Sequence, residues 1–414
     1  MIYGFVSTLI FVLILPFWLI AGIFKKKLIT GFKQKLGWFT SPKFEQKSIV
    51  FYGVSVGEIL ALENLIKKTK SEFPNYKLII TTGTQTGQEI AKKKFPNIAD
   101  FITYFPFDFP FCINNFFYKT NPAIIIIAET ELWPNIAYVT KKRNIPLYIV
   151  NGRISDRTYK SYKKLSFFFA PILKKYTQIL TQSESDNNKL ISIGARPETT
   201  KVMGNLKFDI GVNTRGNVSI NKNEGDKIII AGSTHSGEDE IILDTFTKIK
   251  KENKNIKLLI APRHPERNTK VFELCKNTGL TCGKRSQNDD FTNNDIILLD
   301  TMGELGKMYS ICYLAFIGGS FNKTGGHNPL EANIYNKPVI SGPSIHNFKD
   351  IYAIITRTKA GTIVKTKEDL YTKIQKLITN REYYSQACED CKLVFNQNRG
   401  ALDTVIRELH TLLN

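Results

Sequence analysis

The sequence predicts an α/β protein with two doubly wound, Rossmann-like domains and a membrane-anchoring helix at its amino terminus. Apolar segments of four to seven residues alternate with segments of helical periodicity, which is typical of parallel sheets covered by helices. A polar stretch over residues 209–226 interrupts that alternation. A chain of 414 residues is also too long for one ordinary hydrophobic core, so two domains are expected.

The amino-terminal segment predicts a single membrane anchor over residues 1–27. Residues 5–24 are almost wholly apolar and are about as long as a helix that crosses a bilayer. Lys25, Lys26 and Lys27 follow directly, so the positive-inside rule places the body of the protein in the cytoplasm. Two alternatives stay open: a cleaved signal peptide, and a shallow insertion that bends at Pro16.

The first domain is predicted over residues 28–210, beginning with a basic, aromatic linker at 29–42 that suits anionic head groups. The run of isoleucines within 123–128 is a buried strand. Helices are expected at 58–68, from the 83–87 turn to residue 94, and at 159–175. The other strands are expected at 48–54, 76–82, 147–151 and 178–181.

A linker over 211–226 leads to a second domain over 227–395 and then to a carboxyl-terminal helix over 396–414. Helices are expected over 237–251 and from residue 266. The strands of this domain are expected at 227–231, 256–261, 295–299 and 311–317, with a further short strand that begins at Pro338. The two doubly wound domains are expected to face each other across a cleft.

Charge and cysteine content limit the partners and the compartment. A formal net charge of +20 calls for an anionic partner, such as nucleic acid, an acidic membrane or a phosphorylated substrate. The six cysteines form no dense disulfide pattern, which favours a reducing compartment. Cys388 and Cys391 lack the further ligands of a zinc site, so the sequence predicts neither a metal nor a cofactor.

Glu58 is the first candidate catalytic residue, because it lies where a helix begins after the first strand of the soluble body. A first-turn glutamate that complements the helix dipole is the alternative. Residues 53–57 also match the Gly-x-Ser-x-Gly nucleophile elbow, with Ser55 as the nucleophile of a membrane-anchored serine hydrolase. His235, His264 or His327 could supply its base, but an elbow on the first strand is unusual.

Charged residues follow two further strands of the first domain. Glu129 and Glu131 come directly after the isoleucine strand, where carboxylates are costly to place unless they have partners. Arg153, at the end of the next strand, is a possible partner. Lys207 precedes the domain boundary and could face an anionic group.

The loops after the strands of the second domain predict a nucleotide pocket. Glycines and free amides in 318–331, including Gly319 and Ser320, could hold a phosphate. Asn328 and Glu331 are expected on one face of a helix that begins near Pro329, where the carboxylate could accept ribose hydroxyls. The other candidates in these loops are Ser233, His235, Pro262, Arg263, Met302, Gly303, Glu304 and Leu330. Aromatic residues over 104–111 and 116–118 suit acyl chains or the bilayer interface wherever they are exposed.

These motifs together resemble the 3-deoxy-D-manno-octulosonic acid (Kdo) transferases of lipopolysaccharide biosynthesis. The resemblance extends from the anchor to about residue 350, and the family usually has Ala where Gly152 stands. The matching segments are Ser55-Val-Gly-Glu58, Glu129-Thr-Glu-Leu-Trp-Pro-Asn135, Asn151-Gly-Arg-Ile-Ser155, Gly204-Asn-Leu-Lys-Phe-Asp209, Ser233-Thr-His-Ser-Gly-Glu238, Pro262-Arg-His-Pro-Glu-Arg267, Met302-Gly-Glu-Leu305 and Gly325-Gly-His-Asn-Pro-Leu-Glu331.

The resemblance implies a GT-B fold with an interdomain cleft, a CMP-Kdo donor, and a lipid A precursor (lipid IVA) as acceptor at the cytoplasmic face of the cell inner membrane. It also implies that the configuration of Kdo inverts. No metal is expected because no Asp-x-Asp-type signature is evident, and no nucleic acid because the chain lacks the basic helix or aromatic ladder of the familiar binding modules. Glu58 matches the family's catalytic base, while Lys207 and the pair Glu129 and Glu131 match positions that assist the transition state. The positions that match CMP-binding residues are Pro262, Arg263, Met302, Gly303, Glu304, Asn328, Pro329, Leu330 and Glu331.

Overall fold

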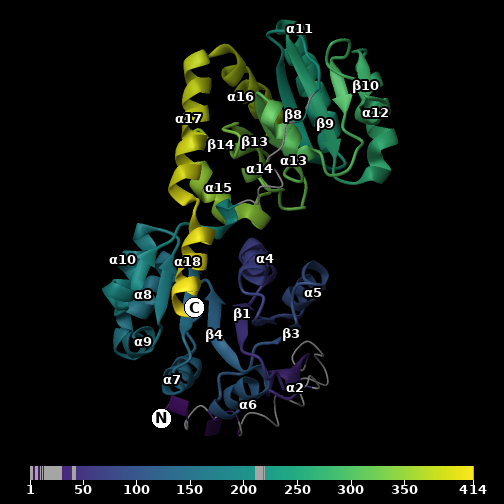
Figure 1. The fold of residues 1–414 in the computed structure, drawn as a ribbon. Helices are drawn as coiled ribbons and strands as arrows, with labels where there is room; N and C mark the ends of the chain where they lie inside the picture. Colours follow the sequence, from purple (N-terminus) through teal and green to yellow (C-terminus); the bar gives the residue numbers. More distant parts are fainter. Residues whose placement is uncertain are drawn as a thin grey trace. The chain divides into compact units, whose positions relative to one another are not determined.

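The computed structural model describes residues 3, 4, 8, 9, 11, 13, 30–39, 43–209, 218 and 220–413. Most of the predicted anchor over 1–27 and half of the 211–226 linker lie outside these residues, so both stay predictions. Among the helices that the structure describes, none has both the length and the apolarity that a membrane crossing requires. The chain divides into unit 1, Met1–Asp209 with Asn398–Asn414, and unit 2, Ile210–Gln397 (Figure 1).

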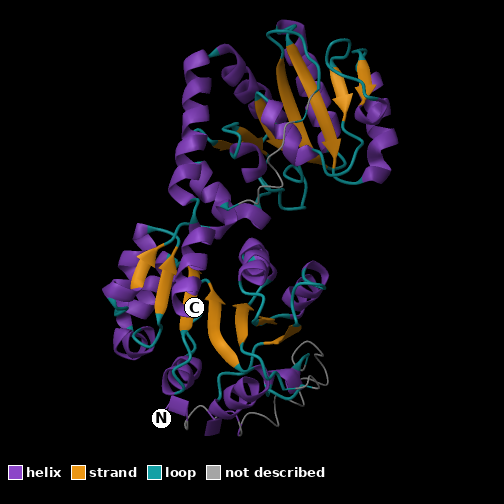
Figure 2. Cartoon of the chain, in the orientation of Figure 1, coloured by secondary structure: helices purple, strands orange, loops and turns teal. Residues whose placement is uncertain are grey.

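Within the described part of unit 1, seven parallel strands form a sheet in the order β3-β2-β1-β4-β5-β6-β7. Helices cover the sheet (Figure 2). Central strand β4 is buried because isoleucines occupy both of its faces, which a strand covered on both sides requires. The strands are β1 Ser48–Gly53, β2 Lys77–Thr82, β3 Phe101–Tyr104, β4 Pro122–Ala128, β5 Leu147–Gly152, β6 Gln178–Thr181 and β7 Thr200–Val202.

Helices of unit 1 pack on a separate apolar cluster at each face of this sheet. The predicted helix over 159–175 is two helices, which meet at Leu165. Likewise the helix predicted over 58–68 is split in two at Leu62. The helices are α2 Phe32–Lys35, α3 Val56–Ala61, α4 Glu63–Glu72, α5 Gln85–Lys94, α6 Pro110–Thr120, α7 Pro134–Lys142, α8 Asp156–Lys164, α9 Ser166–Leu173 and α10 Glu184–Ile193, with the 3-10 turns η2 Pro197–Thr199 and η3 Leu206–Phe208.

The final helix, α18 Ala401–Leu413, belongs to unit 1 although it follows unit 2 in the sequence. Its apolar stripe of Val405, Ile406 and Leu409 joins the cluster that also contains Ile59 of α3. The amphipathic pattern that predicts this helix is therefore satisfied by the core of unit 1.

Unit 2 repeats the architecture, and its described strands form a second parallel sheet of seven in the order β10-β11-β9-β8-β12-β13-β14. The strands are β8 Lys227–Thr234, β9 Ile256–Pro262, β10 Cys282–Lys284, β11 Ile296–Leu298, β12 Leu314–Ile317, β13 Val339–Ser341 and β14 Gly361–Ile363. The helices are α11 Glu238–Glu252, α12 Asn268–Lys276, α13 Leu305–Met308, α14 Leu330–Asn333, α15 Lys349–Ile355, α16 Lys367–Thr379 and α17 Arg381–Asn398.

Both sheets confirm the predicted parallel, doubly wound character. The strands absent from the sequence analysis are β3, β7, β10 and β14, each three or four residues long. Such short segments carry too few residues for an alternation to be recognised. They pair at or next to the ends of the two sheets, where neighbouring strands supply the hydrogen bonds.

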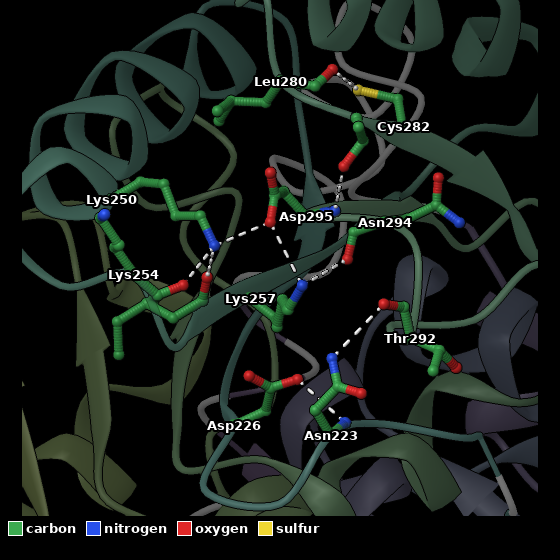
Figure 3. A network of polar contacts seen from close by, with 12 residues as sticks. Asn223, Asp226, Lys250, Lys254, Lys257, Leu280, Cys282, Thr292, Asn294 and Asp295 are labelled. Carbon is green, nitrogen blue, oxygen red and sulfur yellow. Dashed lines mark hydrogen bonds and ion pairs between the residues drawn. The ribbon is translucent and has the colours of Figure 1, made fainter.

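A polar network ties together the amino-terminal ends of β8, β9 and β11 in unit 2 (Figure 3). Asp295 accepts from Lys250 Nζ at 2.7 Å and from Lys257 Nζ at 3.2 Å. The Asn223 side chain donates to the backbone oxygen of Thr292 at 3.3 Å. Burial alone would raise the pKa of Asp295, but its two lysine partners hold that pKa below its usual value. Hydrogen bonds and ion pairs therefore stabilise the amino-terminal edge of this sheet. The candidate site residues lie at the opposite edge, where the strands have their carboxyl ends.

The aromatic residues over 104–118 divide between the core and the surface. Phe105, Phe116 and Phe117 are buried in unit 1, whereas Phe111 and Tyr118 are exposed on α6. Phe107 and Phe109 are partly exposed, so they and the last two residues could contact acyl chains or a bilayer without unfolding of the domain.

Candidate functional site

Glu58 lies in the first turn of α3, directly after β1. Its carboxylate accepts a hydrogen bond from the Val54 amide at 2.5 Å and another from the Ser55 hydroxyl at 2.9 Å. Burial raises the pKa of Glu58 and the nearby charge of Glu129 raises it further, although the two donors oppose that shift. A held carboxylate with a raised pKa is suited to act as a general base.

The hydroxyl of Ser55 donates to Glu58 rather than to an imidazole. His410 is the only histidine in the sequence of unit 1, and its ring lies 3.3 Å from the Glu72 carboxylate. Nothing in unit 1 therefore supports the serine hydrolase alternative, because a serine nucleophile needs a base within hydrogen-bonding reach.

Glu129 follows β4 in a left-handed backbone conformation, with φ of 57°. Its carboxylate accepts from Arg153 Nε at 3.0 Å, as the sequence analysis suggested. The Glu129 amide donates to the Val150 carbonyl at 2.9 Å, so the ends of β4 and β5 together fix this residue. Such a conformation is uncommon for a residue with a side chain and is found often at functional sites.

Glu131 lies two residues further along the same loop, and its carbonyl accepts from the Tyr176 hydroxyl at 3.0 Å. Burial raises the pKa of Glu131 to about 7, and the charges of Glu58 and Glu129 add to the shift. The carboxyl edge of unit 1 thus brings three predicted carboxylates into electrostatic contact, of which Glu129 has a cationic partner.

Lys207 lies on η3, after the last strand of the sheet, and a network of side-chain amides fixes its backbone. The Asn205 carboxamide accepts from the Lys207 amide at 3.0 Å and donates to Gln182 at 3.2 Å. Buried Asn151 accepts from the amide of Leu206 at 3.0 Å. These amide side chains were not predicted as site residues, although Asn151 and Asn205 both lie within the matching motifs.

Glu238 organises the corresponding edge of unit 2, and the sequence analysis did not single it out. Its side chain is buried at the start of α11. The carboxylate accepts four backbone amides: His235 at 2.9 Å, Gly319 at 2.6 Å, Ser320 at 2.8 Å and Phe321 at 2.8 Å. An acidic residue in a first helical turn usually complements the helix dipole, so the sequence alone offers no signal for this bridge.

Gly319 and Ser320, which the sequence predicts as substrate-binding residues, both donate their amides to Glu238. The Ser320 hydroxyl is buried as well, donating to the Ile317 carbonyl at 2.7 Å and accepting from Gly342 at 2.8 Å. Both residues stabilise the loop after β12, because the Glu238 carboxylate occupies the anion-binding hollow that the successive backbone amides of this loop form.

Two histidines join the loops after β8 and β12. The Nε2 atoms of His235 and His327 lie 2.9 Å apart, and His264 stands edge-on to His235 with ring centroids at 5.3 Å. Burial lowers the pKa of His327 to about 4, and the charge of Arg263 contributes. Burial also lowers the pKa of His235, so both rings are neutral at pH 7 and one donates to the other. Ser233 enters this loop with φ of 56°.

Arg263, in the loop after β9, and Glu331, on helix α14, interact electrostatically. Burial raises the pKa of Glu331, and the Arg263 charge opposes that shift. Helix α14 begins at Leu330 with Pro329 as its N-cap, as expected. Asn328, however, precedes the helix, and its side chain accepts from the Leu330 amide at 3.1 Å. The prediction that Asn328 and Glu331 share one helix face is therefore wrong, because Asn328 lies before the N-cap residue and its side chain binds the backbone instead.

Met302, Gly303 and Glu304 form the loop after β11. Met302 is exposed, with 79% of its surface accessible, and Gly303 has φ of 81°, which favours glycine. Glu304 accepts from Thr301 and pairs with Arg285 at 3.4 Å, and these contacts lower its pKa. The Glu304 carboxylate is thus already partnered, while the Met302 side chain is free to contact a ligand.

Comparison with known families matches residues 30–210 to the family described as 3-deoxy-D-manno-octulosonic-acid transferase (kdotransferase). The chain is 34% identical over 367 residues to a 3-deoxy-D-manno-octulosonic acid transferase of Haemophilus influenzae, covering 87% of this chain and 86% of that protein. It is 36% identical over 400 residues to a bifunctional glycosyltransferase/methyltransferase of Fusobacterium nucleatum. That match covers 94% of this chain but 61% of the longer relative.

A solved structure shares the fold without close sequence similarity. The UDP-GlcNAc 2-epimerase of Neisseria meningitidis, solved with UDP-GlcNAc, aligns with a TM-score of 0.53 at 12% identity, over 88% of this chain and 100% of that one. Identity this low supports the architecture of two parallel sheets alone. On the sequence relationships, the chain belongs to the 3-deoxy-D-manno-octulosonic acid transferase family of glycosyltransferases.

Proposed function

We propose that this protein transfers Kdo from CMP-Kdo to a sugar hydroxyl of a lipid A precursor, with inversion of configuration and release of CMP. Membership of the family supports the reaction type, and the net charge of +20 suits two anionic substrates. Unit 1 supplies the base and unit 2 holds the donor nucleotide. The amino-terminal segment anchors the protein to the inner membrane, with the catalytic body on its cytoplasmic side.

The environment of Glu58 is the observation that carries this proposal. Its carboxylate is held by Val54 and Ser55, and burial raises its pKa toward the working range of a base. Glu58 accepts the proton of the acceptor hydroxyl as that oxygen forms a bond to the anomeric carbon of Kdo. The bond from this carbon to the phosphate oxygen breaks on the opposite face, and its electron pair leaves with CMP.

The donor nucleotide in this proposal contacts the strand-end loops of unit 2. Arg263 matches the phosphate with a planar set of donors, and Glu331 accepts the ribose hydroxyls. Ser233 and His235 lie in the adjoining loop, and Lys207 stabilises developing negative charge during transfer. The remaining residues proposed to contact the donor are Pro262, Met302, Gly303, Asn328, Pro329 and Leu330.

Replacing Glu58 by Gln tests the proposal, because the amide keeps the shape of the side chain but cannot accept the proton. We expect turnover to fall by about a hundredfold or more. The measurement is the mass of the product formed from CMP-Kdo and the tetra-acylated precursor. Binding of CMP, followed by calorimetry, is expected to match that of the parent protein and so shows that the variant is folded.

A parental rate of Kdo transfer by the folded Glu58→Gln variant would refute this role. The variant Ser55→Ala separates the transferase from the hydrolase. A serine hydrolase would lose all turnover and would be labelled by a fluorophosphonate, whereas the transferase retains activity and is not labelled.

A further inference from the structure

A cavity of about 440 Å³ lies at the carboxyl end of β2 in unit 1. Its walls come from α2, from the turn between β2 and α5, and from the end of β3. Most of the lining residues carry polar side chains, and their carbon atoms together with the ring of Tyr104 form apolar parts of the wall. The lining side chains that matter are Lys35, Thr84, Gln85, Thr86, Glu89 and Tyr104.

Lys35 is a cation in this cavity without an anionic partner. Its Nζ lies 4.9 Å from the ring centroid of Tyr104 and 5.9 Å from that of Phe107. Among the residues that the structure describes, no carboxylate comes within ion-pair distance of this ammonium group. Burial lowers the pKa of Lys35, because the ammonium has lost water without gaining a counter-charge. An anionic ligand in the cavity would supply that charge.

The cavity adjoins the loop that holds Glu58. The amide and the hydroxyl of Thr84 both donate to the Val54 carbonyl, at 3.1 and 3.0 Å. The amide of Val54 in turn donates to the Glu58 carboxylate at 2.5 Å. Val54 therefore links Thr84 to Glu58, and a ligand that contacts Thr84 would be separated from the proposed base by this one residue.

Glu89 adds a carboxylate to the lining of this cavity. Its carboxylate accepts from the Gln85 side chain at 3.0 Å and raises the pKa of Tyr104, after the larger effect of burial. These groups match a phosphorylated sugar. Its hydroxyls could donate to the Glu89 carboxylate, and its phosphate could pair with the Lys35 ammonium. A purely apolar chain would leave these groups unsatisfied.

We propose that this cavity binds a phosphorylated sugar of the acceptor and that Lys35 pairs with its phosphate. The inference rests on the proposed function, because it assigns the cavity to the substrate whose hydroxyl Glu58 deprotonates. The proposal predicts that the protein distinguishes acceptors by this phosphate, because an acceptor without a phosphate would leave the Lys35 ammonium unpaired.

The test compares Lys35→Met with Lys33→Met, a matched variant of an exposed lysine on the same short helix. The probe is the bis-phosphorylated, tetra-acylated precursor in detergent micelles without CMP-Kdo, and the same lipid after enzymatic removal of its phosphates. We expect Lys35→Met to raise the Kd of the phosphorylated lipid about tenfold and to leave that of the dephosphorylated lipid unchanged. Lys33→Met is expected to change neither, and Lys35→Arg to restore most of the affinity.

Three results would overturn the inference. Equal losses for both lipids would show that Lys35 acts through packing, and no loss for either would show that the phosphate binds elsewhere. Weaker binding of Lys35→Met to phosphatidylglycerol vesicles, with normal binding of the precursor, would assign the lysine to lipid head groups. Because binding is measured without the donor, it is independent of turnover; absence of Kdo transfer by the parent protein would instead refute the proposed function.

Discussion

The carboxylates of unit 1 show how the surroundings of a residue decide its chemistry. Glu58, Glu129 and Glu131 all follow strands of one sheet, yet within the described part of the chain only Glu129 has a cationic partner, Arg153. Burial raises the pKa of Glu58 and brings that of Glu131 to about 7. Carboxylates whose surroundings separate their pKa values can take different roles, which is how one site holds both a base and a neutral acid.

The acid limb of the pH–rate profile provides a test at this scale. Glu58 works as a base only when ionised, so activity is present above its pKa and is lost as the pH falls through it. Glu129→Gln removes a negative charge that raises this pKa, so the limb should move to lower pH. Arg153→Met leaves Glu129 without its partner, so the limb should move to higher pH.

The measurement is kcat/KM against pH for the parent protein and the two variants. Lys160→Met, a change to an exposed lysine of α8, serves as the control and should leave the limb in place. Shifts of the same sign in Glu129→Gln and Arg153→Met would contradict this electrostatic assignment.

Between elements, Glu238 of α11 determines how two loops of unit 2 lie. It accepts the amide of His235 in the loop after β8, and amides of the loop after β12 that are 81 to 83 residues away in sequence. The same loops carry His235 and His327, whose rings contact each other at 2.9 Å. Glu238 therefore positions groups proposed to bind the donor while remaining buried itself.

Glu238→Gln should lower the free energy of unfolding of unit 2 by about 1–3 kcal/mol, because a neutral amide with one acceptor oxygen cannot satisfy four amides. We also expect weaker binding of CMP, measured by calorimetry. Glu240→Gln is the matched control, since it makes the same change at an exposed position of α11. Unfolding of Glu238→Gln at the parental temperature, with unchanged CMP affinity, would remove Glu238 from this role.

On the scale of the whole molecule, the chain returns to unit 1 after completing unit 2. The Asp209 carboxylate accepts from the amides of Gly400 and Leu402 at 2.7 and 2.6 Å, where α18 begins. The Asn205 amide donates to the Asn398 carbonyl at 3.0 Å. The motif that contains Lys207 therefore also binds the segment that follows unit 2. The place where the chain leaves unit 1 and the place where it re-enters unit 1 are thus held together by hydrogen bonds.

Leu409→Ala tests this assignment of α18, because Leu409 is fully buried in a cluster of unit 1. We expect unit 1 to lose about 2–5 kcal/mol of stability, as truncations of buried leucines do. Hydrogen exchange should accelerate in β1 and β4 and stay unchanged in β8 and β9. Thr411→Ala, at an exposed position of the same helix, should change neither set of strands. Faster exchange in β8 instead would place the helix with unit 2.

The sequence was sufficient for features that depend on neighbouring residues. The isoleucine run of β4, the alternation of strands and helices and the helical stripe of α18 are all visible as hydrophobic periodicity. Loop residues such as Glu58 and Arg263 could be chosen because the carboxyl ends of parallel strands meet at one edge. Short strands such as β10 and β14 had too little pattern to be recognised.

Sequence alone therefore determined that the chain forms two parallel sheets with polar strand-end loops, and which family it belongs to. Only the tertiary structure decided that Glu238 accepts the amides of Gly319 and Ser320, and that Lys35 has no anionic partner among the residues described. It also decided that α18 packs on unit 1. The reason is that periodicity records which faces are apolar, whereas partners for amides and charges come from segments distant in the chain, which no local pattern encodes.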